Sequence, residues 1–178
     1  MALPPAYVRA GAMRAFWDTG GSEVELGLTA DESTLVIEQA GEEITAEQYG
    51  ASPIDYLYGG QKVTARLLFL DWNNTSLLKL LPGSTQSAGP TRKAWQIGNI
   101  PGVLASSLAK LLRLHPVKTA DITDDSEDIV LYLAAPIMVA EIALSNRRAR
   151  ALAVSFLALV DTSKADGNLL GRWREDLA

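Results

Sequence analysis

Apolar residues that alternate with polar ones at every second position constrain the fold of this chain more than any other feature. Glu23 to Leu28 alternates strictly, and Ser33 to Gln39 and Gln61 to Trp72 repeat the pattern. Because successive side chains of a strand point to opposite faces, this period predicts half-buried β-strands. Apolar runs at Lys110 to Val117 and Asp128 to Leu133 are interpreted as further strands. The chain is therefore expected to be mainly β.

Two later apolar runs, Ile137 to Leu144 and Ala151 to Asp161, flank a short polar turn, and this arrangement predicts a hairpin. One helix is expected at Asn73 to Leu81, because an asparagine can cap its start, leucines form an apolar stripe and Pro82-Gly83 ends it. Together the elements predict one domain over residues 1–178, a two-layer antiparallel β-sandwich with one flanking short helix.

A long polar stretch from Ala40 to Gly60 separates two of the predicted strands. It is rich in turn-forming residues and far longer than a hairpin connection, so we expect an inter-strand loop at 40–60 with a function of its own. Residues 162–178 carry Leu169, Leu170 and Trp173 and are interpreted as an ordered C-terminal arm.

Composition excludes several classes of protein. The 178 residues include no cysteine and one histidine, so we expect no disulfide, no metal site and no cofactor. The net charge of −5 opposes a tight electrostatic grip on nucleic acid. His115, between Leu114 and Pro116, is interpreted as a strand-end residue, and the acidic stretch Asp121 to Asp128 as a solvated loop. No pair of carboxylates is singled out for catalysis, so no catalytic residue is expected.

Membrane targeting is not expected either. Prolines stand at positions 4 and 5, where a signal peptide needs an apolar helix, and the run Ile129 to Ala140 is too short to cross a bilayer as a helix. These features predict a soluble protein of a reducing compartment that makes no membrane contact.

Several segments follow one another in an order that is typical of one protein family. They are Glu47 to Asp55, Gly59 to Val63, the helix Asn74 to Pro82, the strand Leu112 to Pro116, the closing strand Ala151 to Leu159 and the Gly167-Asn-Leu-Leu tail. In this order the chain resembles the tail tube proteins of long-tailed bacteriophages and of related gene-transfer particles.

The resemblance implies a structural protein whose copies form six-fold rings that stack into a tube. Each copy would give four strands to a barrel shared around the ring, and the lumen would conduct DNA without binding it. The partners that it implies are further copies of the chain, a tape-measure protein and a tail terminator or baseplate. The implied location is the tail of the virion, with assembly in the host cytoplasm.

Contacts between subunits or rings are expected in the 40–60 loop and in the arginine-rich turn of the last hairpin. The residues concerned are Glu42, Glu43, Glu47, Tyr49, Pro53, Ile54, Asp55, Tyr56 and Tyr58 of the loop and Arg147, Arg148 and Arg150 of the turn. The arginines are expected to meet acids of the next copy, because stacking brings unlike surfaces together; a solvated turn is the alternative. Glu38, Glu42 and Glu43 are expected to make the lumen acidic, which would keep DNA mobile.

Three other functions stay open. The inner tube of a contractile secretion or injection system would share the subunit fold. A small-ligand-binding β-barrel would need an apolar pocket with few polar groups. A carboxylate enzyme would need a cleft with two perturbed acids.

Overall fold

The computed structural model describes residues 12–18, 21–30, 33–70, 80–81, 83–88, 93–96, 98, 101–119, 121–142 and 151–173. The strands are β1 (Met13–Asp18), β2 (Glu23–Leu28), β3 (Thr34–Thr45), β4 (Pro53–Phe69), β5 (Thr85–Ala88), β6 (Lys93–Gln96), β7 (Lys110–Pro116), β8 (Ile129–Ile142), β9 (Leu152–Leu159) and β10 (Gly171–Trp173). The helical segments are the 3₁₀ turn η2 (Glu47–Tyr49) and the short α-helix α2 (Ala105–Leu108). Within these residues no helix is long and apolar enough to cross a membrane.

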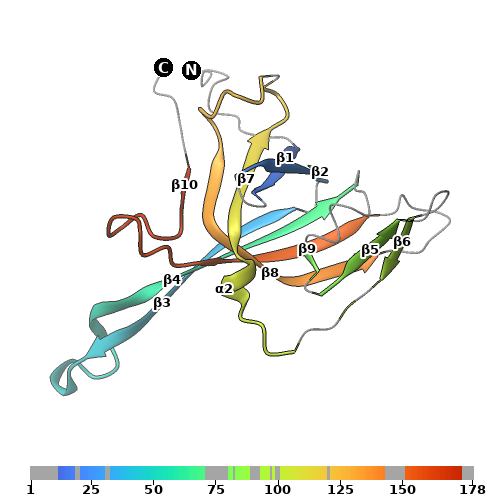
Figure 1. The fold of residues 1–178 in the computed structure, drawn as a ribbon. Coiled ribbons are helices and arrows are strands. Elements are labelled where there is room, and N and C mark those ends of the chain that lie inside the picture. The colour runs from blue at the N-terminus through green and yellow to red at the C-terminus, as the bar shows by residue number, and fades with distance from the viewer. Residues whose placement is uncertain are drawn as a thin grey trace.

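The described strands form one large antiparallel sheet and a separate β5–β6 pair (Figure 1). The large sheet has eight strands. Seven of them follow the order β2-β1-β7-β8-β9-β4-β3, and the eighth, β10, pairs with the start of β8. The sheet is not closed into a barrel. The mainly β, antiparallel character predicted from the alternation is confirmed, but the two expected sheets are one continuous sheet that folds over itself.

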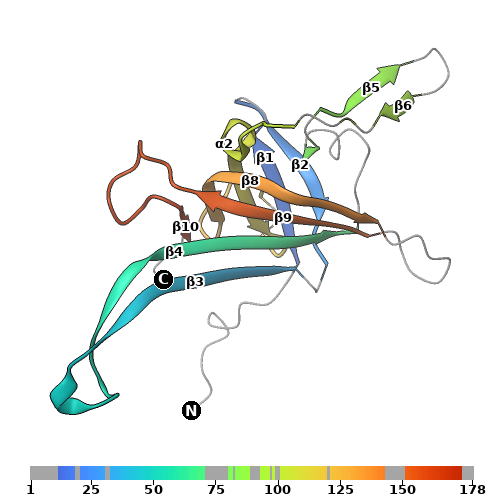
Figure 2. The ribbon, with the colours of Figure 1, turned by 90° about the horizontal axis from the view of Figure 1, so that it is seen from below.

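The sheet folds over along β8, because one part of β8 pairs with β7 and another part pairs with β9. The first part of β8 pairs with β7 as far as Ala134, and the part from Leu133 onward pairs with β9. We call β2, β1, β7 and the first part of β8 the β7 side, and the remainder of β8 with β9, β4 and β3 the β9 side. Figure 2 shows β3, β4, β9 and β8 running together, with β1 and β2 on another level.

The sequence predicted two strands where β8 is one, because Pro136 interrupts the apolar run. In the structure the ladder with β9 shifts register just after Pro136, and the pairing with β7 has already ended. Proline is tolerated at such a position because its missing N–H is not needed by a neighbour on both edges. The break in the pattern therefore marks a bend, not an end.

The core lies between the two sides. Side chains of β9 are buried at every second position, beginning with Leu152. The ring of Phe156 on β9 lies 5.1 Å from that of Trp17 on β1, so the two sides pack directly on each other. Each large apolar side chain buried here contributes about 1.5–3 kcal/mol. The segment after β2 also approaches β4, because the amide of Ala30 donates to the carbonyl of Leu68 at 2.7 Å.

The prediction of an inter-strand loop at 40–60 is wrong. Residues 40–45 continue β3 and residues 53–60 belong to β4, and the two strands stay paired from Thr34 with Arg66 to Thr45 with Pro53. Only residues 46–52, which include η2, form the connection. Both faces of this ribbon are exposed, so it carries no alternation by which sequence could reveal it.

Other predicted segments lie partly outside the residues that the structure describes. Of the predicted helix Asn73 to Leu81, residues 73–79 lie outside the described residues. The last hairpin is confirmed by the pairing of β8 with β9, whereas its turn, residues 143–150, is not described. The C-terminal segment is described as far as Trp173, where β10 joins β8.

Candidate functional site

A hairpin arm, residues 36–62, is the most prominent surface feature of the molecule. It consists of the outer parts of β3 and β4 with the connection between them, and it projects beyond the rest of the sheet (Figures 1 and 2). Every residue of its two strands, 36–45 and 53–62, is exposed. The arm collects the expected contact residues Glu42, Glu43, Glu47, Tyr49, Pro53, Ile54, Asp55, Tyr56 and Tyr58, but it places them on a β-ribbon and its tip.

The arm exposes large apolar side chains. Leu57 is 62% exposed and Tyr58 is 68% exposed, and Ile44, Tyr49 and Ile54 are also open to solvent. A two-stranded hairpin by itself is marginally stable in water. Grouped apolar side chains on a protruding element usually mark a surface that another chain covers. The arm therefore has the composition of a contact surface.

Local packing fixes how the tyrosines sit on the arm. The rings of Tyr56 and Tyr58 stand edge to face with centroids 5.1 Å apart. The ring of Tyr56 lies across the α-carbon of Gly41, where any side chain would collide with that ring and with the carbonyl of Leu57. Gly41 is thus required by a close approach of side chain and backbone. Gly59, one residue beyond Tyr58, forms the bulge that shifts the register.

Pairing along the arm decides which acids share a face. Glu42 pairs with Leu57 and Glu43 pairs with Tyr56, so the two adjacent glutamates point to opposite faces. Glu38 shares the face of Glu42, four residues earlier on β3. The lumen-facing assignment of Glu38, Glu42 and Glu43 stays a prediction, but the register puts Glu43 on the face of Tyr56 and Tyr58, opposite the face that carries Glu38 and Glu42.

The face that carries Glu38 is mixed in charge. Lys62 pairs with Glu38 in register, and its ammonium lies 3.4 Å from the carboxylate. Arg66 is exposed on the same face, opposite Thr34. Both partners of the Glu38–Lys62 pair are well exposed, so this contact contributes little to stability.

Two strand edges of the β9 side are unpaired within the described residues. No described strand pairs with the outer edge of β3, and none pairs with β8 beyond Ala134 on the edge opposite β9. An unpaired edge presents backbone N–H and C=O groups to solvent and is a template for pairing with another chain. The β9 side is thus open at both margins.

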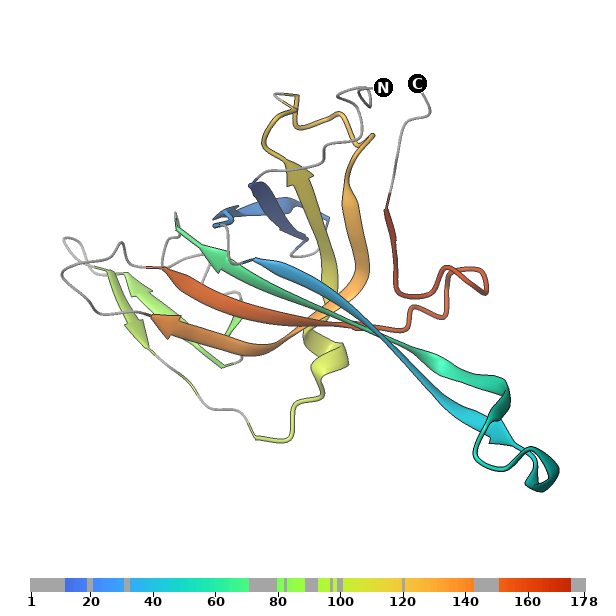
Figure 3. The same ribbon diagram turned by 180° about the vertical axis from the view of Figure 1, so that it is seen from behind.

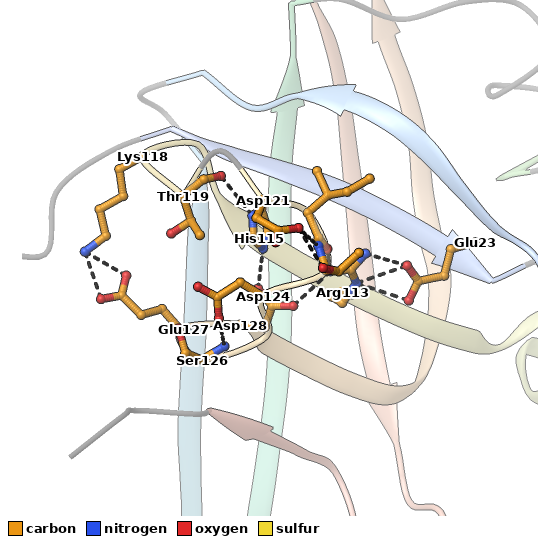
Figure 4. Close-up of polar contacts among 12 residues, drawn as sticks. Glu23, Arg113, His115, Lys118, Thr119, Asp121, Asp124, Ser126, Glu127 and Asp128 are labelled. Carbon is orange, nitrogen blue, oxygen red and sulfur yellow. Dashed lines mark hydrogen bonds and ion pairs between the residues drawn. The ribbon is translucent and has the colours of Figure 1, made fainter. Parts of the chain in front are cut away.

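A second polar cluster lies on the outer face of the β7 side, under the loop of residues 117–128 (Figure 4). Asp128 is fully buried and accepts from His115 Nδ1 at 2.7 Å and from Arg113 Nη1 at 3.0 Å. His115 Nε2 faces the carbonyl of Thr119 at 3.2 Å. Both ring nitrogens therefore face acceptors, and the ring can donate to both only when it carries two protons.

Arg113 ties this cluster to the edge of the sheet. Its guanidinium donates from Nε to both carboxylate oxygens of Glu23 at 3.1 Å and from Nη1 to the carbonyl of Ile122 at 3.0 Å. It also lies 4.4 Å from the ring centre of Phe16. Burial by itself would lower the pKa of Arg113, but hydrogen bonds to Glu23 and Asp128 outweigh burial and raise it.

This cluster is structural in character. His115, only 1% exposed, ends β7 as expected, but the sequence did not reveal its buried partner, because Asp128 stands at the end of an acidic stretch that was interpreted as solvated. The side chains of Arg113, His115 and Asp128 contact one another, Glu23 and backbone carbonyls, and a cavity of about 450 Å³ lies against the cluster with Glu23, Arg113, Asp125 and Asp128 in its lining. Among the described residues no group of three or more histidines, cysteines or acids could hold a metal ion.

An apolar cleft lies between the arm and β10. It has a volume of about 550 Å³, and its walls come from β3, β4, the start of β8 and β10 with the loop before it. Its lining includes Leu35, Ile37, Val63, Leu131, Leu170 and Trp173. A second cavity of about 350 Å³ lies beside it and shares Leu35 and Ile129 in its lining. The cleft was not anticipated from the sequence.

The other expected site residues, Arg147, Arg148 and Arg150, lie outside the described residues. A comparison with models of known protein families finds no match. A comparison with curated protein sequences also finds none.

Proposed function

We propose that the chain is the structural subunit of a phage tail tube, in which hexameric rings of this subunit stack and enclose a lumen that conducts DNA. The exposed arm is the observation that carries the proposal. It places apolar side chains such as Leu57 and Tyr58 beyond the body of the subunit, where they are open to solvent and available to another chain.

The edges of the β9 side support ring formation. Along this side the strands β8, β9, β4 and β3 alternate in direction, so β8 and β3 at its two margins run opposite ways. In a rotationally symmetric ring, β3 of one copy would then meet β8 of the next as an antiparallel neighbour. An even number of antiparallel strands per copy is what a closed ring requires, and closure removes both open edges.

Barrel geometry supports a lumen wide enough for DNA. Six copies giving four strands each at a spacing of ~4.8 Å and a tilt of ~40° produce a backbone diameter of roughly 48 Å. Side chains would reduce the inner width to roughly 35–40 Å. The arm strand from Val36 to Thr45 spans about 30 Å at the rise of an extended strand, which is long enough to reach into the next ring.

The lumen wall that follows from this arrangement is less acidic than the wall predicted from Glu38, Glu42 and Glu43. The face of the β9 side away from the core carries Glu38, with Lys62 and Arg66 beside it, and Glu42 follows on the arm. We therefore assign Glu38 and Glu42 to the wall and Glu43 to the contact between copies. Arg147, Arg148 and Arg150 remain proposed partners for acids of the neighbouring copy, and a tape-measure protein and a terminator or baseplate the further partners.

A second candidate function is favoured by the cleft of about 550 Å³, which suits a small apolar ligand bound by a single subunit. The two functions differ in the mass of the working particle. A ligand carrier can work as a monomer, whereas a tube subunit must reach rings or polymers. An inner tube of a contractile system would assemble in the same way and would differ in having a sheath around it.

Negative-stain electron microscopy and sedimentation of the concentrated protein test the proposal. We expect rings or tubes from the natural sequence and folded monomers from Leu57→Ser/Tyr58→Ser. Ile122→Ser is the control, because Ile122 is also exposed, lies far from the arm along the chain and uses its backbone carbonyl to accept the hydrogen bond from Arg113. Monomers at every concentration, or tubes of normal length from the arm variant, would contradict the proposal.

A further inference from the structure

Two backbone carbonyls of the connection between β7 and β8 face side chains of β7. The carbonyl of Ile122 accepts from Arg113 Nη1 at 3.0 Å, and the carbonyl of Thr119 lies 3.2 Å from His115 Nε2. The structure describes this connection at residues 117–119 and 121–128, and Figure 3 shows it at the end of the molecule away from the arm. Arg113 keeps its contact at any ordinary pH, because a guanidinium keeps its charge. The contact of His115 depends on how many protons the ring carries.

The surroundings of His115 suit a charged ring. Nδ1 lies 2.7 Å from the carboxylate of Asp128, which is fully buried, and Nε2 faces a carbonyl oxygen, which can only accept. A neutral imidazole has one N–H, so it donates to one of these acceptors and turns a lone pair toward the other. The doubly protonated ring donates to both, and the carboxylate beside it favours its charge.

Charged groups of the neighbouring elements also face this ring. On β7, Arg113 donates to the carboxylate of Asp128 at 3.0 Å, and in the connection Asp121 lies close enough to interact with the charge of the ring. On β1, Arg14 stands opposite the histidine in register and lies 3.9 Å from the carboxylate of Glu25. Because Arg113 stays bonded to Asp128, the buried carboxylate keeps a cationic partner when the ring is neutral.

We propose that His115 is a proton-dependent latch, whose doubly protonated ring ties Thr119 to Asp128 and whose neutral ring releases Thr119. The neutral ring keeps its N–H on Nδ1, because a hydrogen bond to a carboxylate is stronger than one to a neutral carbonyl. Nε2 then turns a lone pair toward the Thr119 oxygen, and this carbonyl moves away toward water. Histidine ordinarily changes its charge between about pH 5 and 8, so the latch is closed in acid and opens as the pH rises.

Release of Thr119 loosens one wall of the cavity of about 450 Å³ beside the cluster. Ile122, Thr123 and Asp125 of the connection line that cavity together with Glu23 and Arg113. An open latch therefore gives water more access to the guanidinium and to the buried carboxylate behind it. The proposal does not depend on the tube function, because every contact that it uses lies within one subunit.

Amide exchange of the peptide from Pro116 to Asp128, measured by mass spectrometry on dilute full-length protein and normalised to the intrinsic exchange rate, tests the latch. We expect its protection to fall about tenfold from about pH 5 to pH 8, while β9 keeps its protection. The chain has one histidine, so no other imidazole contributes. His115→Gln has no charge at either pH and should show low protection of this peptide without pH dependence. Lys118→Gln is the matched control, because it removes an exposed ion pair with Glu127 from the same connection and should keep the natural pH profile.

Nitrogen-15 magnetic resonance of the natural chain gives a second measurement that does not depend on the folding of a variant. We expect both ring nitrogens of His115 to carry protons at about pH 5 and Nδ1 alone at about pH 8, with a shift of the Thr119 carbonyl carbon over the same range. A ring whose charge is constant over this range, or one protonated on Nε2 alone at the higher pH, would overturn the proposal. Equal protection at the two pH values, a natural pH profile in folded His115→Gln, or loss of the profile in Lys118→Gln would also overturn it.

Discussion

The arm and the cluster around Asp128 differ in which side chains they expose to water. In the cluster, charged groups are taken out of water and every described partner comes from the same chain, with contacts of 2.7 Å to His115 and 3.0 Å to Arg113. On the arm, apolar groups such as Leu57 are left in water. Under the proposed function, the stability of the subunit and its association would depend on separate regions. Substitutions should therefore affect one property without the other.

The largest expected effect comes from breaking the cluster. Asp128→Asn keeps the shape of the side chain but removes the charge that Arg113 and His115 share, and it should lower the free energy of unfolding by about 3–5 kcal/mol. Glu127→Gln is the control, because the Lys118–Glu127 ion pair is partly exposed and should contribute at most about 1 kcal/mol. Urea titration followed by circular dichroism measures both. Equal losses would show that the burial of Asp128 is unimportant.

A smaller effect on folding, with a large effect on association, is expected in the arm. Gly41→Ala pushes a methyl group against Tyr56 and the Leu57 carbonyl, which should cost about 1–3 kcal/mol locally and reduce tube formation. At Gly59 the nearest atom would be the Ala40 oxygen at 3.5 Å, an ordinary contact, so Gly59→Ala should change stability by less than about 0.5 kcal/mol. Amide exchange of residues 36–62 and sedimentation distinguish the two. Identical behaviour of both variants would refute the role assigned to Gly41.

The smallest effect concerns the exposed loop over the cluster. The hydroxyl and amide of Thr123 donate to Asp121 at 2.6 Å and 2.9 Å and lower the pKa of that carboxyl below its ordinary 3.8. A carboxyl whose pKa falls on folding stabilises the fold above its unfolded pKa, and this contribution is lost as the pH drops through the folded value. Thr123→Ala should raise the pKa of Asp121 in a carboxyl titration by nuclear magnetic resonance. The pKa of Asp161, which is lowered by Ser163, should not move.

Sequence patterns found several strands that pack against the core. β2 was predicted from strict alternation, β7 and β9 were predicted from apolar runs, and β9 buries every second residue. The arm was missed because its exposure on both faces removes the period on which such a prediction depends. β1 and β10 were missed because they are short, and their pairing partners β7 and β8 are distant in sequence.

The polar cluster was missed for a different reason. Asp128 stands in an acidic stretch, where composition favours solvation, and its burial depends on tertiary packing against β7. The sequence contained one local signal, because Asp128 stands directly before the apolar run that begins at Ile129. In the structure this run is β8, which pairs with the strand that carries Arg113. The contact residues of the arm were proposed individually, but their division between two faces required the register, which the sequence pattern alone does not provide.

The position of β1 between β2 and β7 has a consequence for synthesis of the chain. β1 can pair with β2 as soon as both leave the ribosome, but its other neighbour begins at Lys110, and the Arg113–Glu23 contact joins residues 90 positions apart. Pairings of such separation close slowly, because the intervening chain must first lose its freedom. The arm strands, by contrast, are joined by a short local connection. The ribbon that projects into solvent is therefore expected to form early, while the first strands to be made wait with one edge open until much of the chain has emerged.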